Sequence, residues 1–158
     1  MVDETTFTME SAALLPVLYR IGMSILHSDA DAQDAVQQGL LKAWAKRANA
    51  WPEHFRAWLT RITINECRNI QRYRKRVYPM DSIMEARDFE PPDRSLYEAI
   101  AEMGEKLRIP LLLKYRENYS EKEIAQILQI PVSTVKSRLY QARLTLTKSL
   151  KDMEVAFE

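Results

Sequence analysis

The sequence predicts an all-α protein of two small helical domains, a helical bundle and a helix-turn-helix domain, joined by a flexible acidic linker. Apolar residues recur at intervals of three and four wherever a period is clear, which is the helical repeat. Three glycines in 158 residues leave few positions for hairpin turns or glycine-rich phosphate loops. Three of the seven prolines fall within residues 77–94, where no period continues. We therefore expect domains at 1–76 and 95–158, with the linker at 77–94.

The first domain opens with an apolar stripe at spacings of four, three and four, made of Leu14, Leu18, Ile21 and Ile25. A second helix begins near Ser28, a good N-cap, with Asp29 and Asp31 in its first turn. Its apolar residues are Val36, Leu40 and Trp44. Its outward side holds Asp34, Gln37, Gln38 and Lys42 beside Leu41. A polar face with an exposed leucine suits a protein-binding surface or a solvated face equally well.

A long third helix is expected from about Pro52 to Arg76, with apolar residues near one face at Phe55, Leu59, Ile62 and Tyr73. A separate narrow arc carries Arg61, Asn65, Arg68 and Arg72, bordered by Trp58, Lys75 and Arg76. Residues 61–76 hold six bases and one acid. Cations that hold phosphates, beside aromatic rings that stack on unpaired bases, favour a nucleic-acid strand over a solvated arginine face. For Phe55 and Trp58 individually, packing in the core is the favoured alternative.

Four helices are expected in the second domain, at residues 96–103, 107–115, 120–128 and about 132–150. Ser120 and Glu123 form a capping box at the start of the third. Pro131 stands where a proline enters the fourth, so these two helices and their tight turn form a helix-turn-helix. Gln129 occupies a turn position that often holds glycine, and we expect strain or a slightly different turn there.

The last predicted helix has an apolar side and a small, polar, basic side. The apolar residues are Val135, Leu139, Ala142 and Leu146. The opposite face carries Ser133, Lys136, Ser137, Tyr140 and Gln141, flanked by Thr134 and Arg138. Such a face can enter the major groove, where Lys136 reaches guanine or phosphate and Gln141 pairs with adenine. The alternative is an ordinary helical hairpin with a solvated face.

The composition excludes several classes of protein. Cys67 is the one cysteine, which rules out an internal disulfide and a cysteine-based zinc site. His27 and His54 lie far apart in the sequence, so we expect no metal and no cofactor. No apolar run approaches the ~18 residues of a membrane span, which predicts a soluble, cytoplasmic protein without direct membrane insertion. The net charge of +1 by itself predicts no partner.

Three segments together resemble the bacterial sigma factors of the extracytoplasmic-function (ECF) group, in the sigma-70 family. They are DADAQDAVQQGLLKAW (29–44), FRAWLTRITINECRNIQRYRKR (55–76) and the helix-turn-helix of 120–146. The first two are similar to conserved region 2 and the last to region 4. The resemblance implies a transcription initiation factor that binds core RNA polymerase, directs it to promoters through −10 and −35 elements, and helps melt the −10 region.

The resemblance also implies roles for individual residues. Docking on the β′ clamp helices of polymerase would use Asp34, Gln37, Gln38 and Leu41, although Gln38 departs from the acidic residue common there. The −10 element would be captured and melted by Asn49, Trp51, Phe55, Trp58, Arg61, Asn65, Arg68, Asn69 and Arg72. The −35 element would be contacted by Ser133, Thr134, Lys136, Ser137, Arg138, Tyr140, Gln141 and Arg143. Further implied partners are the polymerase β flap and an anti-sigma factor, with no small-molecule substrate.

Three other interpretations compete with this one. A stand-alone helix-turn-helix regulator leaves the basic arc of residues 61–72 unexplained and would normally be a dimer on palindromic sites. A sigma-like decoy that binds an anti-sigma protein without binding promoters would tolerate alanine at Arg61, Arg68 and Lys136. An enzyme is the weakest, because Asp34, Glu66 and His54 have no spacing that resembles a triad, a metal set or a carboxylate pair.

Overall fold

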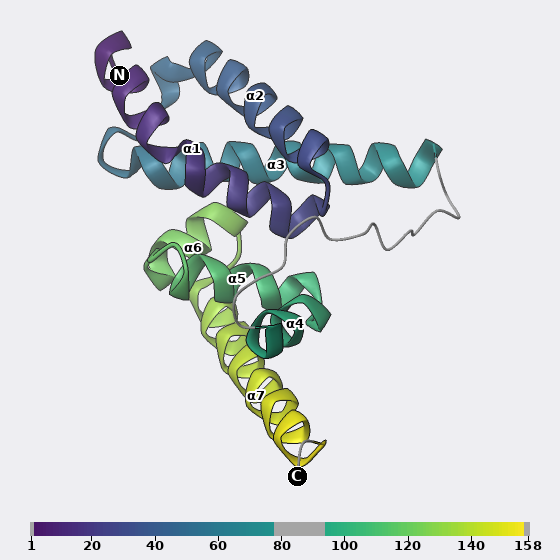
Figure 1. Cartoon of the computed structure of the whole chain (residues 1–158). Coiled ribbons are helices and arrows are strands. Elements are labelled where there is room, and N and C mark those ends of the chain that lie inside the picture. The colour runs from purple at the N-terminus through teal and green to yellow at the C-terminus, as the bar shows by residue number, and fades with distance from the viewer. Residues whose placement is uncertain (1, 78–93, 157–158) are drawn as a thin grey trace. The chain divides into compact units, whose positions relative to one another are not determined.

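The structure is a computed structural model that describes residues 2–77 and 94–156. It divides into two compact units, Met1–Ala86 and Arg87–Glu158, which we describe separately. All regular elements in the described ranges are helices, which confirms the predicted fold class (Figure 1). The predicted linker at 77–94 lies outside the described residues except for its first and last positions.

The first unit is built from three long helices, α1 (Glu4–Leu26), α2 (Asp29–Ala45) and α3 (Phe55–Val77), which pack on one another. Two short 3-10 turns, η1 (Arg47–Asn49) and η2 (Pro52–His54), connect α2 to α3. All members of the predicted apolar stripe of α1 are buried, namely Leu14, Leu18, Ile21 and Ile25. They face a core to which α2 contributes Val36 and α3 contributes Leu59.

The ends of α1 and α2 are fixed by side-chain caps and a left-handed residue. The Asp3 carboxylate accepts a hydrogen bond from the Thr6 backbone N–H at 2.7 Å, and this bond lowers the pKa of Asp3. His27 ends α1 in the left-handed conformation, with φ of 54°. Ser28 then caps α2 by accepting from the backbone N–H of Asp31, as the sequence predicted.

Helices α2 and α3 approach each other closely where Gly39 meets Thr63. A Cβ atom added to Gly39 would lie 3.0 Å from Thr63 Oγ1 and 3.3 Å from Thr63 Cα. A side chain at this crossing would be in tighter contact than is usual, so Thr63 would have to move by a few tenths of an ångström to admit it. The crossing sets the distance between the surfaces that α2 and α3 present.

Helix α1 is long and apolar enough to cross a membrane by length and composition, which contradicts the expectation that no run of the chain would be. In this fold its apolar side packs against α2 and α3. Leu18 and Ile21 are each 1% exposed or less, so this side of α1 belongs to the core of the first unit.

One residue of the apolar face predicted for α3 does not belong to the core. Phe55 and Leu59 are buried and Ile62 packs partly against the core, whereas Tyr73 is 55% exposed. The cause is the length of α3, which continues past the ends of α1 and α2 (Figure 1). Its last turns therefore place Tyr73 in solvent.

The second unit contains α4 (Arg94–Glu102), α5 (Glu105–Tyr115), α6 (Glu121–Leu128) and α7 (Val132–Ala156). The long helix α7 packs against each of the other three. Both hydrogen bonds of the predicted capping box are present, since Ser120 Oγ accepts from the Glu123 backbone and the Glu123 carboxylate accepts from the Ser120 backbone. The four predicted helices of this domain are confirmed, with bounds within two residues of the predicted ones except at the end of α7, which continues six residues further.

The turn between α6 and α7 has the strain that the sequence predicted. Gln129 adopts the left-handed conformation, with φ of 57° and ψ of 47°. A side chain with a Cβ costs roughly 1–2 kcal/mol in this region. The turn is closed by a hydrogen bond of 3.1 Å from the Ile130 backbone N–H to the carbonyl of Ala125. It fixes where α7 begins relative to α6.

Candidate nucleic-acid interface

The N-terminal half of α7 presents one continuous polar face. Val135, Leu139 and Ala142 are each 0% exposed and anchor the opposite side of the helix. The residues on the outer side are all exposed, namely Ser133, Lys136, Ser137, Tyr140 and Gln141. Thr134 and Arg138 are half-buried at its edges. Every residue predicted for −35 contact in this helix therefore borders or lies on one surface.

Arg143 extends this polar face by one more turn. Its guanidinium donates a 2.9 Å hydrogen bond to the hydroxyl of Tyr115, at the end of α5. Both side chains are exposed, so the pair lies on the surface of the domain. The contact ties the outer face of α7 to α5 and limits where the Arg143 side chain can point.

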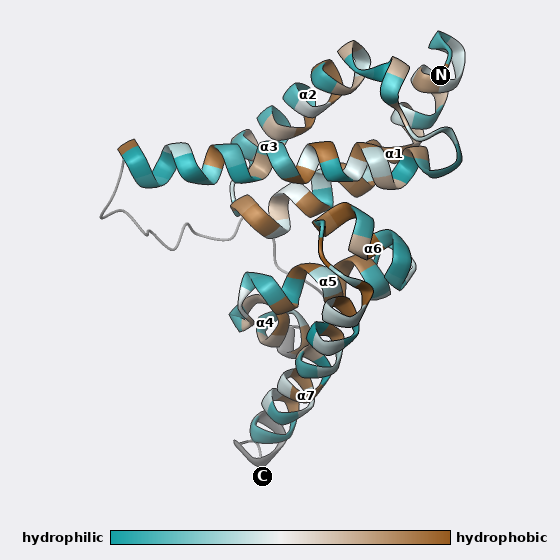
Figure 2. Ribbon diagram, turned by 180° about the vertical axis from the view of Figure 1, so that it is seen from behind, coloured by the Kyte–Doolittle hydropathy of each residue, from teal (hydrophilic) through white to brown (hydrophobic). Residues whose placement is uncertain are grey.

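The predicted basic arc of α3 is an accessible surface in the structure. Arg68, Asn69 and Arg72 are exposed, and Arg61 and Asn65 are half-buried. The guanidinium of Arg61 lies 5.4 Å from the ring centroid of Trp51, which is also half-buried. Asn49, at the end of η1, is exposed. Figure 2 shows the hydrophilic residues that follow α3 along its length.

Two aromatic residues predicted for −10 contact are in the core instead. Phe55 is 4% exposed and Trp58 is 6% exposed. The Phe55 ring packs edge-on against Phe7 of α1, with centroids 5.6 Å apart, and lies 5.7 Å from the Trp58 ring. Buried rings offer no face to an unpaired base in this structure, which favours the core-packing alternative, and contact with the −10 element stays a prediction for both.

One arginine of the basic run on α3 is used to hold the fold together. Arg74 donates to the backbone carbonyl of Leu26 at 3.0 Å and pairs with the carboxylate of Asp31. It thereby joins the end of α3 to the turn between α1 and α2. The helical period could have separated it from the arc, because Arg74 lies about 200° around the helix from Arg72 at ~100° per residue.

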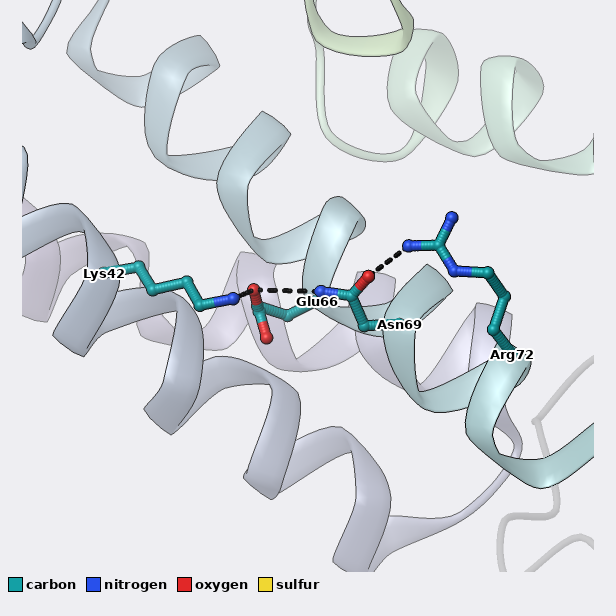
Figure 3. A network of polar contacts seen from close by, with 4 residues as sticks. All are labelled: Lys42, Glu66, Asn69 and Arg72. Atoms are coloured by element: carbon teal, nitrogen blue, oxygen red, sulfur yellow. Dashed lines mark hydrogen bonds and ion pairs between the residues drawn. The ribbon is translucent and has the colours of Figure 1, made fainter. Parts of the chain in front are cut away.

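A network of polar side chains crosses from α2 to the basic arc. Figure 3 shows it running from Lys42 through Glu66 and Asn69 to Arg72. Lys42 forms an ion pair with Glu66, and the Asn69 amide donates to the same carboxylate oxygen at 3.4 Å. The Arg72 guanidinium donates to Oδ1, the side-chain amide oxygen of Asn69. The sequence around Glu66 carries no signal of this network, because its partner Lys42 lies 24 positions away on another helix.

The outer surface of α2 combines polar and apolar side chains. Asp34, Gln37 and Gln38 are exposed, and Leu41 is 64% exposed. Trp44, one turn further on, is partly exposed, with the Arg47 guanidinium 3.8 Å from its ring centroid. The four residues predicted to bind polymerase thus share one accessible surface. Within the described ranges, no three His, Cys, Asp or Glu side chains are grouped to hold a metal ion.

Comparison with known proteins identifies the family. Residues 12–77 match the family described as Sigma-70 region 2, and residues 93–146 match Sigma-70, region 4. The chain is also 31% identical over 152 residues to the RNA polymerase sigma-H factor of Pseudomonas aeruginosa, covering 81% of this chain and 77% of that protein. The chain belongs to the sigma-70 family. It is also 31% identical over 134 residues to the ECF RNA polymerase sigma-E factor of Escherichia coli K12. This match covers 72% of this chain and 70% of that protein, and it places the chain in the ECF group.

A solved structure agrees with this assignment. The sigma factor RpoE, in its complex with the anti-sigma factor NepR from Bartonella quintana, matches with a TM-score of 0.76 and 28% identity. The match covers 92% of this sigma factor and 96% of that chain. The arc of α3 falls within the region 2 match, and the outer face of α7 falls within the region 4 match.

Proposed function

We propose that this ECF sigma factor binds core RNA polymerase and brings it to promoters, with region 4 reading the −35 element and region 2 capturing and melting the −10 element. One observation carries the proposal. Each of the two matched regions presents its own exposed polar and basic helix face, on α3 and on α7. A stand-alone regulator of the helix-turn-helix class needs only the second.

Region 4 is proposed to read duplex DNA with α7 in the major groove. Lys136 and Gln141 are the side chains suited to base edges, because an ammonium donates to guanine acceptors and an amide pairs with adenine. Ser133, Ser137 and Tyr140 suit contacts to phosphate and sugar, which position the helix. Arg143, held by Tyr115, is placed for a phosphate contact further along the groove.

Region 2 is proposed to bind one strand of melted DNA. Arg61, Arg68 and Arg72 supply the charge for phosphates, while Trp51 supplies a ring and Asn65 an amide for an unpaired base. Because these groups suit a single strand better than a duplex, their binding shifts the DNA toward the open state. The chain itself carries out no catalysis in this account, since polymerase makes the RNA.

Polymerase is proposed to hold both regions on one promoter. The surface of α2 with Asp34, Gln37, Gln38 and Leu41 would dock on the β′ clamp helices, and region 4 would contact the β flap. Once polymerase fixes the two regions, binding of one promoter element raises the effective concentration of the other. Tight DNA binding by the isolated sigma factor is then unnecessary, which fits its net charge of +1.

An anti-sigma factor is proposed as a further partner. The matched RpoE structure contains one, and the exposed apolar side chains Leu41 and Trp44 on α2 are suited to bury against a protein. We place the protein in the cytoplasm, where polymerase and its promoters are.

Run-off transcription with purified core polymerase and a genomic promoter library, with and without the sigma factor, tests the proposal. We expect new discrete transcripts whose promoters share two upstream elements at a fixed spacing. Binding to core without new transcripts would favour the decoy interpretation. Failure to bind core on gel filtration would overturn the proposal and leave a DNA-binding regulator.

A further inference from the structure

Glu66 is an unexpected residue in a surface that binds nucleic acid. It is the one acid among residues 61–76, and it is 7% exposed. A buried carboxylate is costly unless it is paired and hydrogen-bonded, and a negative charge near the phosphates of a bound strand repels them. Lys42 of the neighbouring helix α2 offsets both effects. Its ammonium pairs with the buried Glu66 carboxylate and neutralises the negative charge near the strand.

Asn69 connects this buried ion pair to the exposed arginine. A carboxylate only accepts hydrogen bonds and a guanidinium only donates them. The Asn69 side chain satisfies both in one orientation, with Nδ2 donating to Glu66 Oε1 at 3.4 Å and Oδ1 accepting from Arg72 (Figure 3). Its amide is thus directed along the helix, between two protein partners.

We infer that Glu66 is a positioning residue for strand binding, which holds the guanidinium of Arg72 on the basic arc through Asn69 and has its own charge offset by Lys42. The inference rests on the proposed function of the arc. An arginine side chain has many rotamers, and fixing it before binding lowers the conformational cost of the contact. Asn69 acts as the connector in this arrangement, and Asn65 is the amide directed to bases.

The anchor of the network lies beside the other proposed interface of region 2. Lys42 follows Leu41 on α2, and α2 is held against α3 at the crossing of Gly39 and Thr63. The position of Arg72 therefore depends on a residue of α2 that has no place in the basic arc. Lys42→Met, which leaves the Glu66 charge unpaired, is expected to weaken strand binding several-fold.

The experiment is a double-mutant cycle in the reconstituted holoenzyme. The variants are Glu66→Ala, Arg72→Ala and both together, and the measured quantity is affinity for a fluorescent single strand bearing the −10 element of a promoter recovered by run-off transcription. We expect Arg72→Ala to weaken binding several-fold in the wild-type background and by about twofold or less beside Glu66→Ala, since residues of one network are coupled. Glu66→Gln, which keeps an acceptor for Asn69, should restore most of the affinity.

If only the charge of Glu66 mattered, Glu66→Ala would tighten strand binding and not weaken it. Removal of an acid beside the strand should tighten binding, as we expect for the control Glu53→Ala, which removes an exposed acid of the same domain. Tighter binding by Glu66→Ala, or equal fold effects of Arg72→Ala in both backgrounds, would overturn the positioning role. If Glu66→Ala does not fold, the exposed Asn69→Ala takes its place in the cycle.

Two further variants in the same binding assay, Arg61→Ala and Arg68→Ala, separate this inference from the proposed function. If Arg61→Ala, Arg68→Ala and Arg72→Ala all leave strand affinity unchanged, the arc is not the strand-binding surface, and both proposals fail. If these variants weaken binding but the cycle shows no coupling, only the role of Glu66 fails.

Discussion

The two proposed nucleic-acid faces, on α7 and on α3, differ in how their side chains are held. On α7, the outer residues project from a helix whose other side is buried through Val135, Leu139 and Ala142, and Arg143 at the end of the face is bonded to Tyr115. On α3, the basic residues are tied to neighbours, with Arg61 against Trp51 and Arg72 bonded to Asn69. A duplex has a regular groove that a rigid helix can enter, whereas an unpaired strand is flexible and must be ordered by its binding surface. We therefore expect binding by the α7 face to depend mainly on where the helix lies, and binding by the α3 face to depend more on how individual side chains are held.

The largest expected effect is a loss of stability in one region with no change in the stability of the other. Leu139→Ala should destabilise region 4 by about 2–5 kcal/mol, because a fully buried leucine is lost from a small core. The three tryptophans, at positions 44, 51 and 58, all lie in region 2, so their fluorescence reports that region alone. In urea, Leu139→Ala should leave the tryptophan transition unchanged and shift the loss of helix measured by circular dichroism. Leu59→Ala is the matched variant and should shift the tryptophan transition.

The next effect separates polymerase binding from melting. Arg61→Ala with Arg68→Ala should reduce open-complex formation by about tenfold or more, because two phosphate contacts are lost, while core binding persists. Open-complex formation is measured as the fraction of a recovered promoter that stays bound by holoenzyme after a competitor is added. The charge-retaining pair Arg61→Lys and Arg68→Lys should keep most of the activity. Loss of core binding by the alanine variant would contradict the assignment of this arc to DNA.

A smaller loss of DNA binding is expected from a change on the outer face of α7, which is proposed to read the −35 duplex. Lys136→Ala should weaken binding to the −35 element by about 1–3 kcal/mol if Lys136 contacts a base, and by less if it holds only phosphate. Lys148→Ala, which removes an exposed charge further along α7, is the control. Affinities for −35 duplexes with single base changes distinguish the two cases. An unchanged −35 preference would mean that a different face of α7 reads the DNA.

The smallest effect concerns the turn that positions α7. Gln129→Gly should stabilise region 4 by about 0.5–1 kcal/mol, since glycine adopts the left-handed conformation without the Cβ penalty. Gln129→Ala keeps a Cβ and should gain little. Thermal unfolding followed by circular dichroism measures both. Equal stabilisation by alanine and glycine would show that left-handed strain is not the cause.

Local signals in the sequence predicted region 4 well. The capping box of Ser120 and Glu123, the unusual turn at Gln129 and the apolar side of α7 all depend on residues within a few positions of one another. The capping box is confirmed, Gln129 is left-handed, and Val135, Leu139 and Ala142 are buried whereas Leu146 is only partly buried. Helical period and capping chemistry are properties of the chain itself. The structure adds what those signals do not contain, such as the bond from Arg143 to Tyr115 of α5.

Region 2 was harder to predict because its contacts join distant parts of the sequence. The burial of Phe55 depends on Phe7 of α1, and the pairing of Glu66 depends on Lys42 of α2. A helical period shows which residues share a face but not which neighbour covers that face. The same period grouped Tyr73 with the apolar face of α3, although its side chain is 55% exposed.

Permanganate probing of unpaired thymines at a recovered promoter tests most directly whether α3 acts in melting and α7 in promoter binding. With wild-type holoenzyme, thymines in the −10 element should become reactive. Complexes of the variant Arg61→Ala with Arg68→Ala should occupy the promoter with little thymine reactivity. Complexes of Lys136→Ala should form less readily but react fully once bound. Full reactivity with the α3 variant, or reduced reactivity in bound complexes of the α7 variant, would contradict the account.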